Sequence, residues 1–501
     1  MLNYTGHPFL DVGIAAMTAY AGKRRPDELT ADDLAAVAAY IEANYVRPPL
    51  RGHLTMAFTS NAWFAQDAFN PDKPDLSAEQ RAARRATRDR WAARHLRQWQ
   101  AADQTSGEAC VFTGLPAAPG ELSGKLAPGR AGRAQVPLLQ GDDAINFFTG
   151  GEPGLPIAPA ALLALQFMPL ACAKCGVGLL AVHTDDDDLT FEFARGFLGE
   201  TIQAVTLAQS VGEDKLPGAP RSLRTLLVER LTTIEERRLR TARRSGRAAS
   251  VTAYNFNNGK SPKLEIYHLP LQITSFLRTA LTPAYRDAWQ GIVGRGWQRV
   301  QVKPGKKGAP AEAAEPKHNY LYEDLFTLPD EAARFVRTYF LRVPRPSRSD
   351  DDPRAEYSPR RERDLVSWPL VALFLREVMR MDEQRIERIR LLGDKLAEYT
   401  RRQGGRRFFR AFFTERSRSN FMDLLAKTNI AYVKFTNGRD VLFDLDGYVD
   451  VFMDGADLLR PDWGLARDLV LIRMVEQLKD WLAENPDALP EDEAQPADAH
   501  A

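Results

Sequence analysis

Three cysteines have the spacing in this 501-residue chain that comes nearest to a chemical site. Cys172 and Cys175 stand in the sequence CAKCG, the spacing of a zinc knuckle, in which two thiolates one turn apart share a metal. A structural zinc needs four ligands, and the second half would have to come from Cys110 in CVFTG, where Thr113 replaces the second cysteine. Three interpretations stay open: a degenerate site without metal, a zinc completed by His183 or another group, or buried structural cysteines.

Two other motifs imitate enzyme sites but lack the surroundings that the chemistry needs. Residues 441–447, VLFDLDG, match the first motif of haloacid-dehalogenase-like phosphatases, yet only 54 residues follow Gly447, too few for the domain that this motif should open. The GKS at 259–261 is not a phosphate-binding P-loop, because Tyr254 stands where the first glycine is required. The seven histidines show no paired spacing. We therefore predict that the chain is not an enzyme.

Three arginine-rich stretches, residues 81–97, 221–247 and 401–418, have the residue types that bind nucleic acid. Arginines neutralise phosphates, and exposed aromatic rings stack on unpaired bases; the third stretch interleaves both kinds. The alternative for each is that the aromatic residues are core and the arginines form a solvated or acid-paired face. The candidate contacts are Arg81, Arg84, Arg85, Arg88, Arg237, Arg238, Arg243, Arg244, Arg401, Arg402, Arg406, Arg407 and Arg410.

Two polar turns are candidates for reading base edges. Asn61 lies in the sequence TSN within an otherwise apolar stretch, and Asn257, Asn258 and Lys260 lie in NNGK between two strand-like segments. Asparagine and lysine side chains reach base edges in either groove of DNA. The alternative for both is ordinary turn chemistry.

Bulk properties narrow the class. The composition, 44% hydrophobic and 27% charged, is that of a globular protein, and no run of about 18 apolar residues predicts a membrane span. An odd number of cysteines argues against disulfides, so we expect a cytoplasmic protein. The net charge is +1, but residues 361–418 carry +6 and residues 419–501 carry −10, which permits local basic surfaces.

The candidate residues need ordered elements to hold them, and most of the sequence predicts helices. Residues 8–45 fit two helices, the second capped by Thr30 with Asp33 three residues later. Ser77 can cap a helix that runs to residue 100, and residues 221–247 fit a second basic helix.

The remaining segments predict strands and connections. Residues 250–270 fit a strand, a turn whose NNG supplies left-handed residues, and a second strand; a short strand pair is expected at 431–445. The Pro-rich, charged residues 303–318 and 344–360 fit linkers, and the tail should be disordered.

These patterns predict an α+β fold with a mixed N-terminal region, a loop-rich, degenerate zinc-finger-like cysteine module, and a C-terminal helical bundle. The predicted divisions are 1–104 (helical and mixed), 105–200 (cysteine module), 201–343 (basic helix and hairpin), 344–360 (linker), 361–484 (bundle) and 485–501 (tail).

Several of these segments resemble one known family. The opening at residues 4–34, YTGHPFLDVGIAAMTAYAGKRRPDELTADDL, together with CVFTG, CAKCG and YNFNNGKSPKLEIYHLP, is similar to the CRISPR-associated CXXC-CXXC family. That family supplies the large subunit of a type I-B Cascade, the crRNA-guided surveillance complex. The resemblance runs loosely from residue 4 to about 470 and is most specific at the N-terminus; Thr113 departs from the ligand pattern of the family.

The resemblance implies a non-catalytic role. Such a subunit binds near the crRNA 5′ handle, recognises the protospacer-adjacent motif, and stabilises the R-loop while guide pairing reads the sequence. Its partners would be crRNA, target duplex DNA and the displaced strand, the other Cascade subunits, and a recruited helicase-nuclease or transposition factor. In relatives of such a subunit the C-terminal helical part can also be made separately from an internal start, which here would be Met379 or Met381; the alternative is that both are ordinary internal methionines. A stand-alone nucleic-acid-binding regulator is the alternative.

Overall fold

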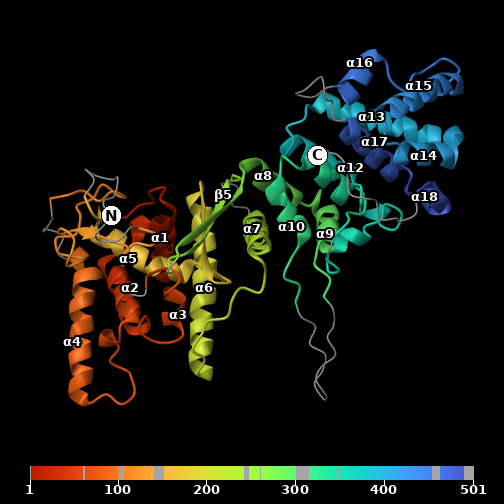
Figure 1. Cartoon of the computed structure of the whole chain (residues 1–501). Helices are drawn as coiled ribbons and strands as arrows, with labels where there is room; N and C mark the ends of the chain where they lie inside the picture. Colours follow the sequence, from red (N-terminus) through yellow and green to blue (C-terminus); the bar gives the residue numbers. More distant parts are fainter. Residues whose placement is uncertain are drawn as a thin grey trace, which may run out of the picture. The chain divides into compact units, whose positions relative to one another are not determined.

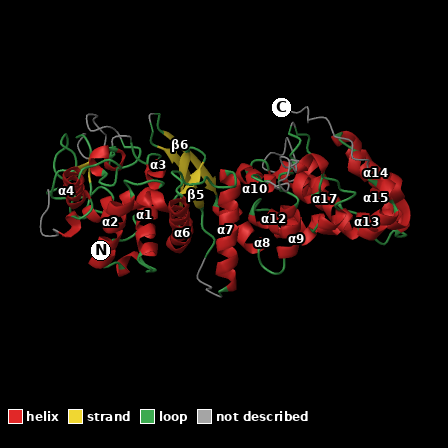
Figure 2. Ribbon diagram, turned by 90° about the horizontal axis from the view of Figure 1, so that it is seen from below, coloured by secondary structure: helices red, strands yellow, loops and turns green. Residues whose placement is uncertain are grey.

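The computed structural model describes residues 2–59, 62–100, 107–139, 152–241, 247–259, 261–300, 315–347, 349–453 and 463–489. The chain divides into two compact units, Met1–Leu271 and Gln272–Ala501, which are called unit 1 and unit 2 below. Both are rich in helices, and the larger sheet belongs to unit 1 (Figures 1 and 2). The predicted mixed helical and strand class is confirmed. No helix in the described ranges combines the length and the hydrophobicity that crossing a bilayer requires.

A four-stranded antiparallel sheet organises unit 1. Its strands are β3 (Ala173–Cys175), β4 (Gly178–Thr184), β5 (Val251–Asn257) and β6 (Lys263–Leu269), in the order β3-β4-β5-β6. The hairpin predicted at 250–270 is therefore confirmed. Its turn is not left-handed as predicted, since neither Asn257, Asn258 nor Gly259 has a positive φ.

Helices cover both faces of this sheet. The helices of unit 1 are α1 (Pro8–Tyr20), α2 (Ala31–Asn44), α3 (Leu50–Leu54), α4 (Ala78–His95), α5 (Pro159–Phe167), α6 (Asp187–Val211) and α7 (Leu223–Arg240). His183 of β4 contacts Asp11 of α1. Tyr267 of β6 points to the opposite face, because it pairs with Ala253 and through it with Val182, and there the guanidinium of Arg224 on α7 lies 5.5 Å from its ring centroid.

Local sequence explains where these helices begin. Thr30 and Asp33 form the predicted capping box of α2, with the Asp33 carboxylate accepting the Thr30 N–H at 2.9 Å. Ser77 caps α4 through the Gln80 N–H at 3.1 Å, and Asp186 caps α6 through the Leu189 N–H at 3.1 Å. Helix α4 ends at His95, before the predicted residue 100.

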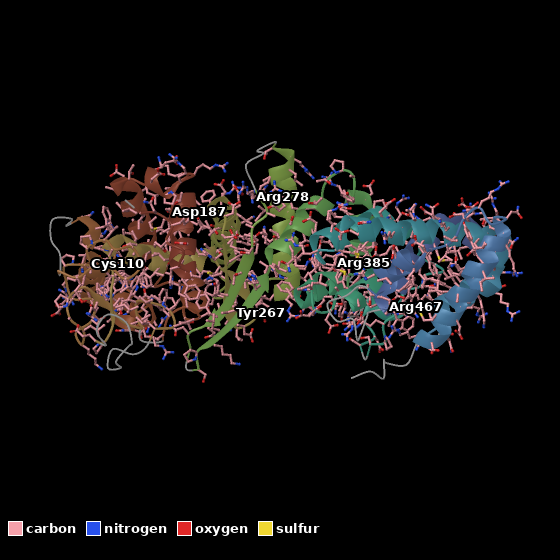
Figure 3. All side chains as sticks on the ribbon, turned by 90° about the horizontal axis from the view of Figure 1, so that it is seen from above. Cys110, Asp187, Tyr267, Arg278, Arg385 and Arg467 are labelled. Carbon is pink, nitrogen blue, oxygen red and sulfur yellow. The ribbon has the colours of Figure 1, made fainter. Side chains whose placement is uncertain are left out.

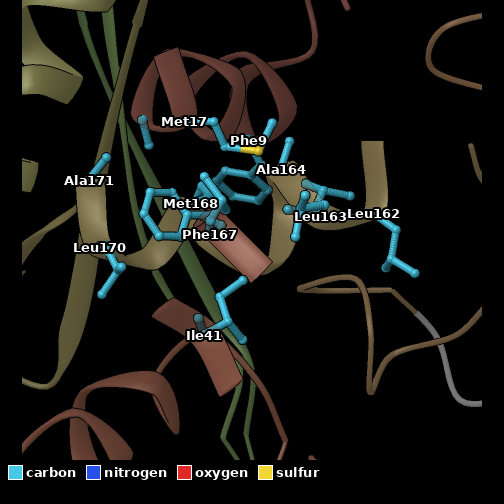
Figure 4. Packing of buried hydrophobic residues seen from close by; sticks show 14 of the residues in the cluster. Phe9, Met17, Ile41, Leu162, Leu163, Ala164, Phe167, Met168, Leu170 and Ala171 are labelled. Carbon is cyan, nitrogen blue, oxygen red and sulfur yellow. The ribbon is translucent and has the colours of Figure 1, made fainter. Parts of the chain in front are cut away.

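The core of unit 1 gathers around α1, which packs directly on α5 (Figure 4). A Cβ placed on Gly13 would lie 2.2 Å from the Ala164 carbonyl oxygen, so only glycine permits this close approach. Met17, Phe167 and Met168 fill the space beside it and are fully buried. Helix α5 and strand β4 lie in the segment 105–200 that was predicted as a separate cysteine module. They instead share one core with the N-terminal helices, and α6 runs through the predicted boundary at residue 200.

Unit 2 is helical in its described residues. Its helices are α8 (Leu271–Ala280), α9 (Arg286–Gly294), α10 (Tyr320–Asp324), α11 (Ala332–Phe335), α12 (Trp368–Glu377), α13 (Glu383–Tyr399), α14 (Gly405–Thr414), α15 (Arg418–Phe435), α16 (Leu445–Tyr448), α17 (Trp463–Gln477) and α18 (Lys479–Glu484). Helices α13 and α17 pack closely, since a Cβ on Gly393 would lie 2.7 Å from the Arg473 side chain. Met379 and Met381 lie between α12 and α13.

Two segments of unit 2 differ from their predictions. The strand pair expected at 431–445 is not formed: α15 continues to Phe435, and a turn with positive φ at Asn437 and Gly438 follows. The segment 344–360, predicted to be a linker, is packed into the unit through buried residues such as Asp352 and Tyr357. Its charged side chains form ion pairs within unit 2, which composition alone does not reveal. The predicted tail from residue 490 lies outside the described residues.

Candidate nucleic-acid interface

The first half of the predicted zinc site is a tight turn. The Gly114 N–H donates to the Cys110 carbonyl at 2.9 Å, and the Cys110 N–H donates to the Leu115 carbonyl at 2.7 Å. Cys110 is 3% exposed. The Thr113 hydroxyl accepts the Leu115 N–H at 3.3 Å, so this residue completes the turn.

Cys172 lies in the core, where a metal would have to displace packed side chains, whereas Cys175 is only partly buried. Cys172 is fully buried, and its thiol lies 3.5 Å from the Met168 carbonyl oxygen as a hydrogen-bond donor. Burial raises the pKa of the Cys172 thiol far above its usual value and raises the pKa of Cys175 to about 12. Binding of zinc here would require both buried thiols to lose their protons.

His183, the proposed additional ligand, is engaged elsewhere. Its Nε2 lies 3.1 Å from Oδ2 of Asp11, which is 1% exposed. In the ranges that the structure describes, no cluster of three or more His, Cys, Asp or Glu side chains is arranged to hold a metal. The residues present therefore do not fit zinc, and the arrangement of Cys110 and Cys172 agrees with buried structural cysteines.

Asp11 itself is a strongly hydrogen-bonded buried carboxylate. It accepts from the Thr5 N–H at 2.7 Å, the Thr5 hydroxyl at 2.9 Å and the Gly6 N–H at 2.8 Å, in addition to His183. Burial alone would raise the pKa of Asp11, but the bonds from His183, Thr5 and Gly6 lower it below its usual value. Asp11 therefore ties the N-terminal residues to the sheet as an anion.

Two of the predicted arginines of α4 are hydrogen-bonded to nearby backbone carbonyls. Arg81 donates to the Leu76 carbonyl at 3.2 Å, and Arg84 donates to the Asn70 carbonyl at 3.1 Å. The Arg88 side chain is 18% exposed and lies 3.7 Å from the Asp89 carboxylate. Arg85 is the member of this predicted set that is exposed to solvent.

The arginines of α7 pair with acids. Arg238 is 2.7 Å from Asp186 and 3.0 Å from Glu235, and Arg237 is 3.5 Å from Glu192. The acid-paired interpretation describes these two residues, because helix α6 presents its N-terminal acids to them. Arg243 and Arg244 lie outside the described residues.

Helix α14 separates its two residue types completely. Phe408, Phe409, Phe412 and Phe413 are at most 8% exposed and pack into unit 2, so they are core residues and not stacking platforms for bases. The exposed face carries the arginines. Arg401, in the π-helical turn Thr400–Gly404 before α14, donates to the Gln477 carbonyl at 2.9 Å.

Four exposed arginines form the surface called the α14 arginine face below: Arg406, Arg407 and Arg410 on α14, and Arg402 in the π-helical turn Thr400–Gly404 that precedes it. Arg402 forms an exposed ion pair with Glu398 at 3.2 Å, and Arg406 lies 3.7 Å from Asp487; the two arginine side chains are 64% and 60% exposed. Among the described residues, no acidic side chain pairs with Arg407 or Arg410. Exposed cations without such partners are available to phosphates.

The predicted reader turn is pinned to the protein. Asn258 is fully buried: its side chain donates to the Ala57 carbonyl at 3.1 Å and accepts from Arg133 at 3.1 Å. The prediction that Asn258 reads base edges is therefore wrong. Asn257 donates to the Val177 carbonyl and accepts the Gly259 N–H at 2.8 Å. Asn61 and Lys260 lie outside the described residues.

A cavity of about 380 Å³ in unit 1 was not predicted. Elements α3, α6 and α7, strand β3 and the loop 216–221 supply its walls, which include His53 and Lys174. No motif in the sequence marks this cavity, and His53 lies on the short helix α3. A lone histidine in an apolar stretch gave no signal of its own.

Acid should destabilise unit 1 through His53. Burial lowers the pKa of His53 from 6.5 to about 4, so between these values the unfolded chain binds a proton that the folded chain excludes. Stability therefore falls as the pH drops through this window, by about 3 kcal/mol. We expect His53→Gln to remove this pH dependence. Between pH 7 and pH 4, the free energy of unfolding of the variant should therefore fall by about 3 kcal/mol less than that of the wild type.

Urea unfolding followed by circular dichroism at pH 7, 5.5 and 4 measures the difference. The matched control is His268→Gln, at an exposed histidine on β6. A difference between wild type and His53→Gln that stays constant with pH would contradict the expectation.

Comparison of the chain with known proteins identifies no relative: no family model, no curated protein and no solved structure matches it.

Proposed function

We propose that this chain is the non-catalytic large subunit of a type I-B CRISPR Cascade. The resemblance of residues 4–34, the cysteine motifs and the hairpin sequence supports the family. The α14 arginine face is the observation that carries nucleic-acid binding, because it exposes cations over a phenylalanine core. Such a face binds backbone phosphates of any sequence, which suits a subunit whose guide RNA supplies the specificity.

In this proposal the α14 arginine face holds the displaced DNA strand. The partners are crRNA, target duplex DNA, the other Cascade subunits and a recruited helicase-nuclease or transposition factor. The buried position of Asn258 leaves recognition of the protospacer-adjacent motif to other residues, with Asn61 and Lys260 still candidates. Binding near the crRNA 5′ handle follows from the family resemblance.

The test is reconstitution of the complex. The tagged chain is expressed with its neighbouring genes and a CRISPR array, and we expect co-purification of one RNA of uniform length. In that complex, Arg407→Glu with Arg410→Glu should weaken binding of matched target DNA at least tenfold at physiological salt and reduce the salt dependence, because phosphate contacts are lost.

Lys427→Glu with Lys434→Glu is the matched control, since both lysines are exposed on α15 and the charge change is the same. Equal loss in both double variants would assign the effect to net charge and overturn the role of α14. A protein that purifies without RNA and binds DNA alone with its own sequence preference would instead be a stand-alone regulator.

A further inference from the structure

The described residues of unit 2 end beside the α14 arginine face. After α18, the short 3-10 helix Pro486–Ala488 packs against α14, and Ala488 and Leu489 are buried. Asp487 stays outside this core, with its carboxylate 3.7 Å from Arg406. The last described residue is therefore held next to the exposed arginines.

Helix α14 holds these arginines on a fixed support. Its four phenylalanines are buried, and Arg467 of α17, labelled in Figure 3, donates to the carbonyl of Glu415 at the end of the helix. Neighbouring cations are one helical turn apart, because Arg406 and Arg410 are spaced i,i+4 and Arg407 and Arg410 are spaced i,i+3. Like charges at these spacings repel one another. Since no acid of the described residues pairs with Arg407 or Arg410, the face is more stable with an anion bound to it.

The sequence that follows Leu489 supplies such an anion. Residues 490–501 lie outside the described residues, and their sequence carries no lysine or arginine but four acids: Glu491, Asp492, Glu493 and Asp498. Three of these acids stand together, within four residues after Leu489. An extended residue spans about 3.3 Å and a helical residue rises about 1.5 Å, so four extended residues cover about twice the rise from Arg406 to Arg410. The acids are therefore tethered within reach of the face.

Covalent attachment strengthens a competitor that would be weak on its own. Exposed ion pairs contribute little one at a time. A short linker, however, holds its ligand at a local concentration on the order of millimolar, so a few weak pairs compete with a free nucleic-acid strand. A strand that makes further contacts elsewhere in a complex still displaces the acids. The segment therefore favours a strand held by several contacts over a brief encounter with any other nucleic acid.

We propose that residues 490–501 occupy the α14 arginine face until a nucleic-acid strand displaces them. The contact between Asp487 and Arg406 is the first pair of this arrangement, and the acids at 491–493 neutralise the arginines beyond it. The segment acts as an internal competitor that lowers binding of nucleic acid outside the guide complex. The inference rests on the proposed function, because it assigns regulation to the same face.

Neutralising the acids tests the inference in the full-length chain. The variant carries Glu491→Gln, Asp492→Asn and Glu493→Gln, and its affinity for a fluorescent oligothymidine strand is measured by anisotropy at low ionic strength. We expect the strand to bind the variant about three- to tenfold more tightly than the wild type, since exposed ion pairs are individually weak. The gain should shrink as salt is added, because salt screens the pairs between the segment and the arginines.

Two comparisons locate the effect. Asp287→Asn with Asp330→Asn and Asp350→Asn changes the net charge equally at exposed acids elsewhere in unit 2, and this control should bind the strand like the wild type. In a background of Arg407→Glu with Arg410→Glu, neutralising the segment should give no gain, because the arginines that it covers are absent. An equal gain in the control, a gain that persists in that background, or no gain at all would overturn the inference.

The outcome is distinguishable from failure of the proposed function. If charge reversal of Arg407 and Arg410 weakens target DNA binding by the complex but the neutralised segment changes nothing, the face binds the strand and the segment does not cover it. If the neutralised segment tightens strand binding but no guide RNA co-purifies with the chain, the internal competitor is real and the Cascade assignment fails.

Discussion

Asp11→Ala is expected to lower the free energy of unfolding of unit 1 by about 3 to 5 kcal/mol. The carboxylate is 1% exposed and accepts from Thr5, Gly6 and His183. Its removal leaves two backbone N–H groups and a histidine without their acceptor and opens space beneath α1. Hydrogen bonds to a charged group are stronger than neutral ones, so their joint loss exceeds the effect of an ordinary surface substitution.

Thermal and urea unfolding of the full chain measure this loss. Asp32→Ala is the control, because that aspartate is exposed in the first turn of α2. The pKa of Asp11 is lowered in the folded protein, so its stabilisation is present at neutral pH and is lost as the pH falls through the lowered pKa. The difference in free energy of unfolding between the wild type and Asp11→Ala should therefore become smaller in strong acid. Equal midpoints for Asp11→Ala and wild type at pH 7 would refute this account.

Asp11 also illustrates what local sequence predicts well. The helices around it were predictable, since Thr30, Ser77 and the small residues near Gly13 act within a few residues of their own position. The bond from Asp11 to His183 joins residues 172 positions apart, and no local pattern encodes it. The segment 105–200, predicted as a separate cysteine module, shares the core of the N-terminal helices for the same reason: its α5 and β4 pack against α1, which is distant in the sequence.

In the candidate interface, too, the local sequence pattern did not reveal which side chains are buried or paired by tertiary contacts. The pattern of α14 left two opposite interpretations of its arginines and phenylalanines open, and only burial shows that the phenylalanines face inward. The asparagines of the hairpin turn were misjudged, because the contact between Asn258 and Ala57 depends on tertiary packing. The arginines of α7 are paired by acids of α6, whose position no composition count provides.

Glu362→Leu is expected to destabilise unit 2 by about 3 to 5 kcal/mol, because it strands a buried cation. Arg342 is fully buried; it donates from Nε to Glu362 at 2.9 Å and lies 3.5 Å from the ring centroid of Tyr357. Arg295 shares the same carboxylate, and Tyr357 donates to the Arg295 carbonyl at 3.0 Å. These contacts fix the segment 344–360. Unfolding of the full chain should therefore show a transition at a lower temperature or denaturant concentration for the variant than for the wild type.

The double variant Arg342→Met with Glu362→Leu decides whether the stranded charge is the cause. If it is, removing both charges should recover most of the loss, since an apolar pair of similar volume replaces a buried ion pair at little cost. Arg295 loses the same partner in both variants, so its contribution cancels when the two are compared. Glu356→Leu, at an exposed pair with Arg299, should behave like the wild type. If the double variant is as unstable as Glu362→Leu, the carboxylate stabilises the segment by its packing, and the charge of Arg342 is not the reason.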